Sequence, residues 1–240
     1  TTGAFAAITP NTFNDVKPSD WYYGAVDHVV SHGYFNGVGA NVFSPNSNMS
    51  RAMAVTVLAR MFAGNLDSYS GQTVFEDVPA DAYYAKAVQW ALDKGITNGT
   101  SATTFSPDGR ATREQISVFL YNAVKVYGSL GNFNSAALNG FADRDQVSSW
   151  SETALQWATT NEVINGNAGR VLPQNSATRA EFATIAMNFD NNYESHSRSE
   201  VDTKQRQRDW LDVQATKSVS MSNMEKQVLD LTNKERAKNG

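Results

Sequence analysis

The chain has 240 residues, of which 41% are hydrophobic and 18% charged, a balance typical of a globular protein with its own core. It contains no cysteine, which excludes disulfides, thiolate metal ligands and a cysteine nucleophile. A formal net charge of -4 argues against a nucleic-acid partner, which needs a basic face. No apolar run approaches the ~20 residues that span a bilayer, so membrane insertion is not expected.

Three stretches of the chain repeat one pattern. Each begins with a phenylalanine two positions before an aspartate, and an aromatic residue follows within the next few positions. In register, the aspartates are Asp15, Asp77 and Asp143, and the aromatic residues are Trp21, Tyr83 and Trp150. We expect the repeats at residues 11–64, 73–128 and 139–190.

The first helix of each repeat is predicted from its apolar residues. They fall at positions i, i+1, i+4 and i+5, as in the run from Ala25 to Val30, and these positions share one helix face. An Asn-Gly pair follows and indicates a turn in which the glycine takes a positive φ angle. The pairs are Asn36-Gly37, Asn98-Gly99 and Asn165-Gly166. A proline then keeps the chain extended until the next helix begins.

The second helix of each repeat is predicted to begin at an arginine, at Arg51, Arg113 and Arg179. Thr112 with Gln115, and Thr178 with Glu181, form capping boxes around the last two arginines. The caps do not explain the arginines, because a cation at the positive end of a helix dipole is mildly unfavourable. Contact with an anionic ligand is one explanation, and a salt bridge to an acid in the same or the next repeat is the other.

The repeats are expected to share one core. The arginines are 62 and 66 residues apart, which suits a module of two helices and a substantial loop. One such module buries too little apolar surface to be stable alone. The sequence therefore predicts a mainly all-α protein whose repeats stand in a row or close around a pseudo-threefold axis.

The combined pattern resembles the S-layer homology (SLH) family of bacterial cell-wall anchoring modules. The second repeat has it most fully, in Phe75-Glu76-Asp77-Val78, Gly95-Ile96-Thr97-Asn98-Gly99, Phe105-Ser106-Pro107 and Thr112-Arg113-Glu114. The resemblance implies a pseudo-threefold arrangement in which one helix from each repeat joins a central bundle. It also implies a protein exported to the bacterial cell surface, where grooves between repeats bind an anionic secondary cell-wall polysaccharide, often bearing pyruvate ketals.

The candidate ligand-binding residues are those that recur. They are Arg51, Arg113 and Arg179; Trp21, Tyr83 and Trp150; Asn36, Asn98 and Asn165; Gly37, Gly99 and Gly166; and Asp15, Asp77 and Asp143. At the arginines, the guanidinium group and the helix N-terminal N–H groups would meet a carboxylate together. Structural alternatives stay open: core packing for the aromatic residues, backbone geometry for the glycines and bonds to loop amides for the aspartates. Arg113 is expected to matter most, because the second repeat has every element of the pattern.

No catalytic, metal or cofactor site is predicted. The histidines are His28, His32 and His196, and none of them recurs. His28 and His32 are four residues apart on a helix, a spacing that can bind zinc, but the glutamate of H-E-x-x-H is missing. Trp90 and Trp157 occupy the same repeat position as His28 and are expected in the core.

Two other functional classes remain open. The repeats could be the carrier part of a cell-wall enzyme whose catalytic domain lies elsewhere, or a scaffold for protein partners and self-assembly. Residues 191–223 are expected to be a polar linker. Residues 224–240 resemble the first helix of the CAP superfamily at Asn233, Glu235 and Arg236.

Overall fold

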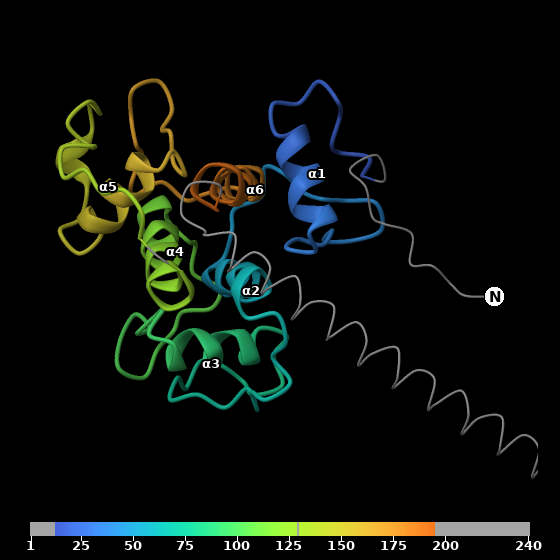
Figure 1. Ribbon diagram of the computed structural model, residues 1–240. Helices are drawn as coiled ribbons and strands as arrows, with labels where there is room; N and C mark the ends of the chain where they lie inside the picture. Colours follow the sequence, from blue (N-terminus) through green and yellow to red (C-terminus); the bar gives the residue numbers. More distant parts are fainter. Residues whose placement is uncertain (1–12, 129, 195–240) are drawn as a thin grey trace, which may run out of the picture. The chain divides into compact units, whose positions relative to one another are not determined.

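The computed structural model describes residues 13–128 and 130–194, and its secondary structure is mainly helical (Figure 1). The α-helices are α1 (Tyr23–Ser31), α2 (Arg51–Phe62), α3 (Ala85–Asp93), α4 (Arg113–Tyr127), α5 (Glu152–Thr160) and α6 (Arg179–Asn188). A 3-10 helix, η2 (Arg144–Gln146), and a π-helix, η3 (Phe189–Glu194), complete the helical elements of the described ranges. Extended pairing in those ranges consists of isolated bridges. The all-α prediction is confirmed.

The tail predictions fall largely outside the described residues. Residues 191–194, where a linker was expected to begin, continue as part of η3. The rest of the expected linker and the CAP-like segment at 224–240 lie outside the described ranges.

The second helix of each repeat begins at its arginine, as the sequence predicts. Thr112 accepts a hydrogen bond from the Gln115 N–H, and the Gln115 side chain accepts from the Thr112 N–H, which completes the capping box of α4. Thr178 and Glu181 form the same box at α6. At α2, Ser50 accepts from Met53 alone, so half of the box is missing there. Each Ser or Thr cap of this kind contributes about 1 kcal/mol to helix stability.

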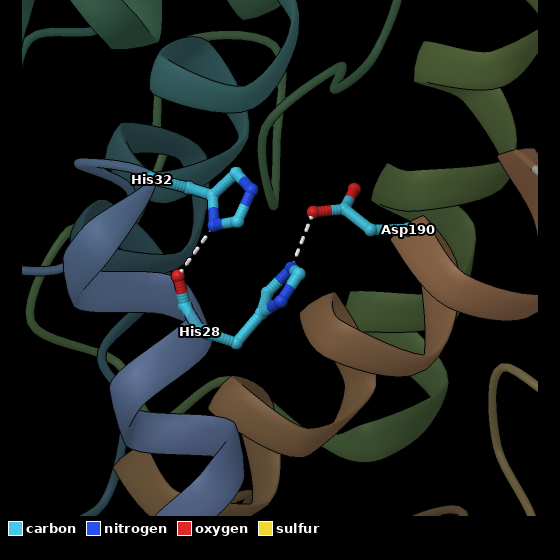
Figure 2. Close-up of side chains that lie close together, drawn as sticks. All are labelled: His28, His32 and Asp190. Carbon is cyan, nitrogen blue, oxygen red and sulfur yellow. Dashed lines mark hydrogen bonds and ion pairs between the residues drawn. The ribbon is translucent and has the colours of Figure 1, made fainter.

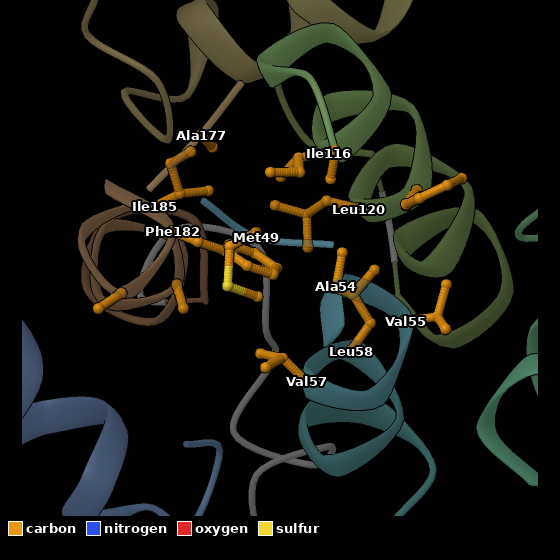
Figure 3. Close-up of a cluster of buried hydrophobic side chains, with 14 of the residues drawn as sticks. Met49, Ala54, Val55, Val57, Leu58, Ile116, Leu120, Ala177, Phe182 and Ile185 are labelled. Atoms are coloured by element: carbon orange, nitrogen blue, oxygen red, sulfur yellow. The ribbon is translucent and has the colours of Figure 1, made fainter. Parts of the chain in front are cut away.

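One core joins the second helices of all three repeats. Leu58 of α2, Ile116 and Leu120 of α4, and Phe182 and Ile185 of α6 belong to a single buried cluster (Figure 3). Side chains of this size contribute about 1.5–3 kcal/mol each when removed from water. The buried side chains of the three central helices therefore stabilise all three repeats together.

The first helix of each repeat packs on the second helix of the preceding repeat. The packed pairs are α3 on α2, α5 on α4 and α1 on α6. Among the described residues, no first helix packs on the second helix of its own repeat. Because α1 returns to α6, the three repeats close on themselves, which decides between the row and the closed arrangement.

Short backbone bridges also join the repeats. Ser50 pairs with Arg110, Thr112 with Ser176, and Asn48 with Thr178. Each bridge places the start of one central helix beside the proline loop of the next repeat. The candidate arginines follow directly after these bridges. No helix of the described ranges has the length and apolar character needed to cross a membrane.

Candidate ligand-binding grooves between the repeats

The three arginines join neighbouring repeats. All three are buried, and in each the Nε–H donates to a backbone carbonyl of the following repeat, the third repeat being followed by the first. The bonds run from Arg51 to Phe105 (2.8 Å), from Arg113 to Val171 (2.9 Å) and from Arg179 to Phe43 (2.7 Å). No ion pair of the described residues includes these arginines. The alternative of a salt bridge to an acidic side chain is therefore wrong. The structural partner is a carbonyl, which leaves the terminal guanidinium nitrogens for other contacts.

The N-terminal N–H groups of the central helices are also engaged by the next repeat. The Arg113 N–H donates to Asn175 O (3.0 Å) and the Glu114 N–H to Pro173 O (2.9 Å). The equivalent bonds are present at Arg51 and Ala52 and at Arg179 and Ala180. These amides are therefore not open to a ligand carboxylate, contrary to the expectation from the sequence. Any anion would be held by the guanidinium group instead.

The three aspartates hold the loops that receive the arginines. Both oxygens of Asp77 accept backbone bonds, from Phe105 N (2.8 Å) and Ser106 N (2.7 Å). Asp15 binds Phe43 and Ser44 in the same way, and Asp143 binds Val171 and Leu172. Ser44, Ser106 and Leu172 have φ angles of 58°, 58° and 54°, a left-handed conformation that side chains disfavour, and the paired bonds stabilise it. Direct ligand contact by these aspartates stays a prediction.

One loop residue in each repeat connects the aspartate to the arginine. Phe105 donates its N–H to Asp77 and accepts from Arg51 through its carbonyl. At Asp143, burial alone would raise the pKa, but the N–H bonds from Val171 and Leu172 outweigh it and hold the pKa below its usual value.

The turn glycines are needed for space. A Cβ on Gly99 would lie 2.5 Å from the Phe75 ring, and one on Gly166 would lie 2.6 Å from the Phe141 ring. Gly99 and Gly166 take the expected positive φ angles, of 80° and 73°. The expectation is wrong for Gly37, which is not among the residues with positive φ. Gly37 still requires a glycine, because a Cβ there would approach the Phe13 ring to 2.8 Å.

The recurring aromatic residues are exposed. Trp21, Tyr83 and Trp150 are 68%, 69% and 57% exposed, so the core alternative is wrong for them. Trp90 and Trp157, by contrast, are buried as expected. The exposed rings are free to stack on a ligand, since aromatic faces are a common platform for apolar ring surfaces.

One groove gathers candidate residues from all three repeats. It has a volume of about 450 Å³, and its lining includes Trp21 from the first repeat, Arg113 from the second, and Asn165, Gly166 and Glu181 from the third. Glu181 was assigned only to the capping box by its sequence position. Its place two residues after the recurring arginine Arg179 was the available signal, but only the closed packing brings it beside Arg113 of another repeat.

Arg179 has neighbours equivalent to those of Arg113 in the groove. Its Nη2 donates to the carbonyl of Asn36 (2.7 Å), and Tyr83 and Arg60 lie near enough to influence its pKa. Burial, reinforced by the Arg60 charge, lowers the pKa of Arg179 to about 10, while Asp15 and Tyr83 act in the opposite direction. Arg179 therefore remains charged at neutral pH. The sequence pattern did not indicate Arg60, because Asn122 and Asn188 occupy its position in the other repeats.

At the remaining arginine, Arg51, a polar atom lacks a partner. Its Nη2 is buried and makes no hydrogen bond, while its guanidinium carbon lies 4.8 Å from the centre of the Phe105 ring. Burial lowers the pKa of Arg51 and that of Arg113. A desolvated guanidinium group gains more from an anion than an exposed one, because the surrounding dielectric is low.

Helix pairs that close into one core, with a groove that contains Arg113 between them, define a tandem-repeat module with a candidate ligand-binding site. The family model described as "S-layer homology domain" matches residues 12–54, 74–116 and 140–183, which together exceed half of the chain. The chain belongs to the S-layer homology family. SLH domains are non-catalytic modules that anchor proteins to the cell wall, which places this chain at the bacterial cell surface.

The curated relatives are mostly surface proteins. The chain is 32% identical to the "Surface-layer 125 kDa protein" of Lysinibacillus sphaericus over 184 residues, covering 75% of this chain and 15% of the relative. It is 24% identical to "S-layer protein EA1" of Bacillus anthracis, covering 78% of this chain and 21% of the relative. An "Endoglucanase" of Bacillus sp. (strain KSM-635) is 29% identical, with 72% of this chain and 18% of the relative covered. The chain thus spans less than a quarter of the length of each of these relatives.

Proposed function

We propose that this chain holds a surface protein to an anionic secondary cell-wall polysaccharide, by binding its carboxylate-bearing sugars in the grooves between repeats. The observation that carries the proposal is the groove of about 450 Å³ that brings Trp21, Arg113 and the Asn165-Gly166 turn together. Its volume is within the range of about 300–1,000 Å³ for small-ligand sites. A groove of this size suits a short stretch of a glycan chain.

The side chains in the groove have complementary tasks. The exposed Trp21 ring offers an apolar face to a sugar ring. Arg113 uses Nε for the Val171 carbonyl, and its terminal nitrogens remain to bind a carboxylate. Asn165 adds an exposed amide at the turn, and Gly166 allows the ligand to approach the backbone closely.

A pyruvate ketal is the anionic group that we favour. It places a carboxylate directly on a sugar, so one ligand would satisfy both the arginine and the aromatic ring. The buried, unpaired Nη2 of Arg51 supports an anionic partner, since an unsatisfied buried donor costs about 1–3 kcal/mol.

A second candidate function is that of a carrier for an enzyme. The endoglucanase relative, of which this chain covers 18%, favours it. In that case the grooves would still bind the wall, and catalysis would belong to another part of a longer protein. A scaffold for self-assembly would instead show as oligomers formed without any glycan.

A calorimetric titration with polymer fragments tests the proposal. Fragments with intact ketals should bind, and the same fragments after mild acid removal of pyruvate should bind at least about tenfold more weakly, because a charged hydrogen bond contributes about 1.5–3 kcal/mol. Equal affinity for both preparations would contradict recognition of the ketal. Absence of binding to either would contradict a polysaccharide ligand.

A further inference from the structure

The contact that closes the three repeats differs from its two equivalents. Trp90 of α3 and Trp157 of α5 are buried where each outer helix packs on the preceding central helix. Their indole N–H groups donate to Tyr127 Oη and to Leu130 O, both at 2.8 Å. At the same repeat position, α1 has His28. The closing contact between α1 and the end of α6 therefore has an imidazole where the others have an indole.

Three possible metal ligands gather at this contact. His28 Nε2 lies 2.7 Å from Oδ2 of Asp190 in η3, and the His32 ring stacks on the His28 ring with centroids 4.1 Å apart. One ligand atom from each of the three residues lies within 4.8 Å of the others, and Figure 2 shows the imidazoles of His28 in α1 and of His32, just after α1, on the side of Asp190. Within the described ranges this is the one cluster of three or more such side chains.

The hydrogen bonds orient His32 for metal binding. Its Nδ1 lies 2.7 Å from the carbonyl oxygen of His28, which can only accept, so Nδ1 carries the proton. The lone pair is then on Nε2. A histidine ligand usually has its second ring nitrogen fixed by a carbonyl or a carboxylate in this way.

Asp190 has an unused oxygen. Its Oδ1 is buried and makes no hydrogen bond, and its side chain is only 11% exposed. Asp190 also belongs to a π-helical turn, a rare element that often occurs at functional sites. An unpaired buried carboxylate oxygen is costly, and a cation bound at Oδ2 would offset part of that cost through its charge.

We propose that His28, His32 and Asp190 form a binding site for a zinc-class divalent metal ion. The ligands would be Nε2 of each histidine and Oδ2 of Asp190, with solvent in a fourth position. Two imidazoles favour zinc or a similar transition metal over calcium and magnesium, which prefer oxygen ligands. The ion would link α1 of the first repeat to η3, which follows the third repeat. It would stabilise the contact that closes the three repeats, which joins segments far apart in the sequence.

The geometry needs only small movements. Zinc–ligand distances of about 2.0–2.1 Å place tetrahedral ligand atoms about 3.3 Å apart. The 2.7 Å contact would open slightly, and the widest separation of up to 4.8 Å would shorten by about 1.5 Å. Small rotations about the side-chain torsions of His32 and Asp190 can supply this change.

A simpler interpretation of the cluster needs no metal: His28 forms a hydrogen bond with Asp190, and His32 caps the end of α1. Asn161, at the repeat position of His32, donates its Nδ2 to Trp157 O (2.9 Å), as His32 does to His28 O. This equivalence provides a discriminating variant. His32→Asn should keep the cap but remove the imidazole ligand.

Zinc chloride titration by calorimetry, with melting curves in zinc and in EDTA, tests the site. The parent chain should bind one zinc ion and melt about 5–10 °C higher at 100 times the dissociation constant. His32→Asn and Asp190→Asn should each weaken zinc binding by more than about tenfold. Asn161→Ala, which removes a cap away from the cluster, should bind zinc like the parent.

The outcomes are distinct. Parent-like zinc binding by His32→Asn would place the metal elsewhere and overturn the proposal. Failure of the parent to bind zinc would leave only the hydrogen bond and would also overturn it. A calcium-induced melting shift as large as that of zinc would contradict the metal class.

Discussion

Replacing Arg113 with alanine should weaken both the fold and ligand binding. The substitution removes the bond from Nε to the Val171 carbonyl, 2.9 Å long and buried. A charged hydrogen bond contributes about 1.5–3 kcal/mol, and the abandoned carbonyl adds part of its own desolvation cost. The free energy of unfolding should fall by about 2–4 kcal/mol, which corresponds to a melting temperature roughly 4–16 °C lower.

The same substitution should reduce affinity for a wall-polymer fragment by about 10–150-fold, because the terminal guanidinium nitrogens would no longer bind the carboxylate. Calorimetric titration, performed well below the melting temperature of the variant, measures this loss. Arg51→Ala and Arg179→Ala should cost less affinity, if the second repeat forms the best-ordered site.

A matched control separates the two effects. Trp90→Phe removes the bond to Tyr127 Oη and should lower the melting temperature, but Trp90 does not line the groove that contains Arg113. Its affinity for the polymer should equal that of the parent. If Arg113→Ala melts lower and still binds like the parent, the arginine has a structural role only and the groove hypothesis is refuted.

Four further variants test individual residues. Trp21→Ala should bind the polymer more weakly in the same titration and change stability by less than about 0.5 kcal/mol, because the ring is exposed. Glu181→Gln should bind an anionic fragment several-fold more tightly with an unchanged melting curve, because a glutamine also completes the cap at Gln115. The pKa of Asp143 is lowered by folding, so its stabilising contribution is complete above about pH 4 and is lost as pH falls through the folded-state pKa. Urea unfolding at several pH values should therefore show that the free energy of unfolding of Asp143→Asn falls less steeply toward acid pH than that of the parent. Glu162 has a φ angle of 54°, so Glu162→Gly should raise the melting temperature by about 1–4 °C, and an unchanged value would mean that this backbone is not strained.

The sequence predicts the helices well because their signals are local. Thr112 and Thr178 cap the helices in which they were placed, and the apolar faces identify the buried side chains. Periodicity does not say which helix covers a face, however. The closed arrangement was implied by the family resemblance, but the packing of α1 on α6 that closes it is seen only in the structure.

The sequence predicted which repeated residues are candidates for the site, but not which of them lie together in one groove. The carbonyl that receives Arg113 belongs to a loop 58 residues away, and no local pattern identifies such an acceptor. Residue type alone also did not decide whether Trp21 is buried in the core or exposed to a ligand. The cluster at His28 was missed because its third member, Asp190, lies 162 residues further along the chain.

Cosedimentation with purified cell walls tests the central claim most directly. The chain should sediment with native walls and remain in solution after the secondary polymer is chemically stripped from them. Moderate salt should weaken this binding without abolishing it, because charges in a partly buried groove are screened less than exposed ones. Binding that survives stripping would point to peptidoglycan itself or to nonspecific adhesion, and would contradict the account.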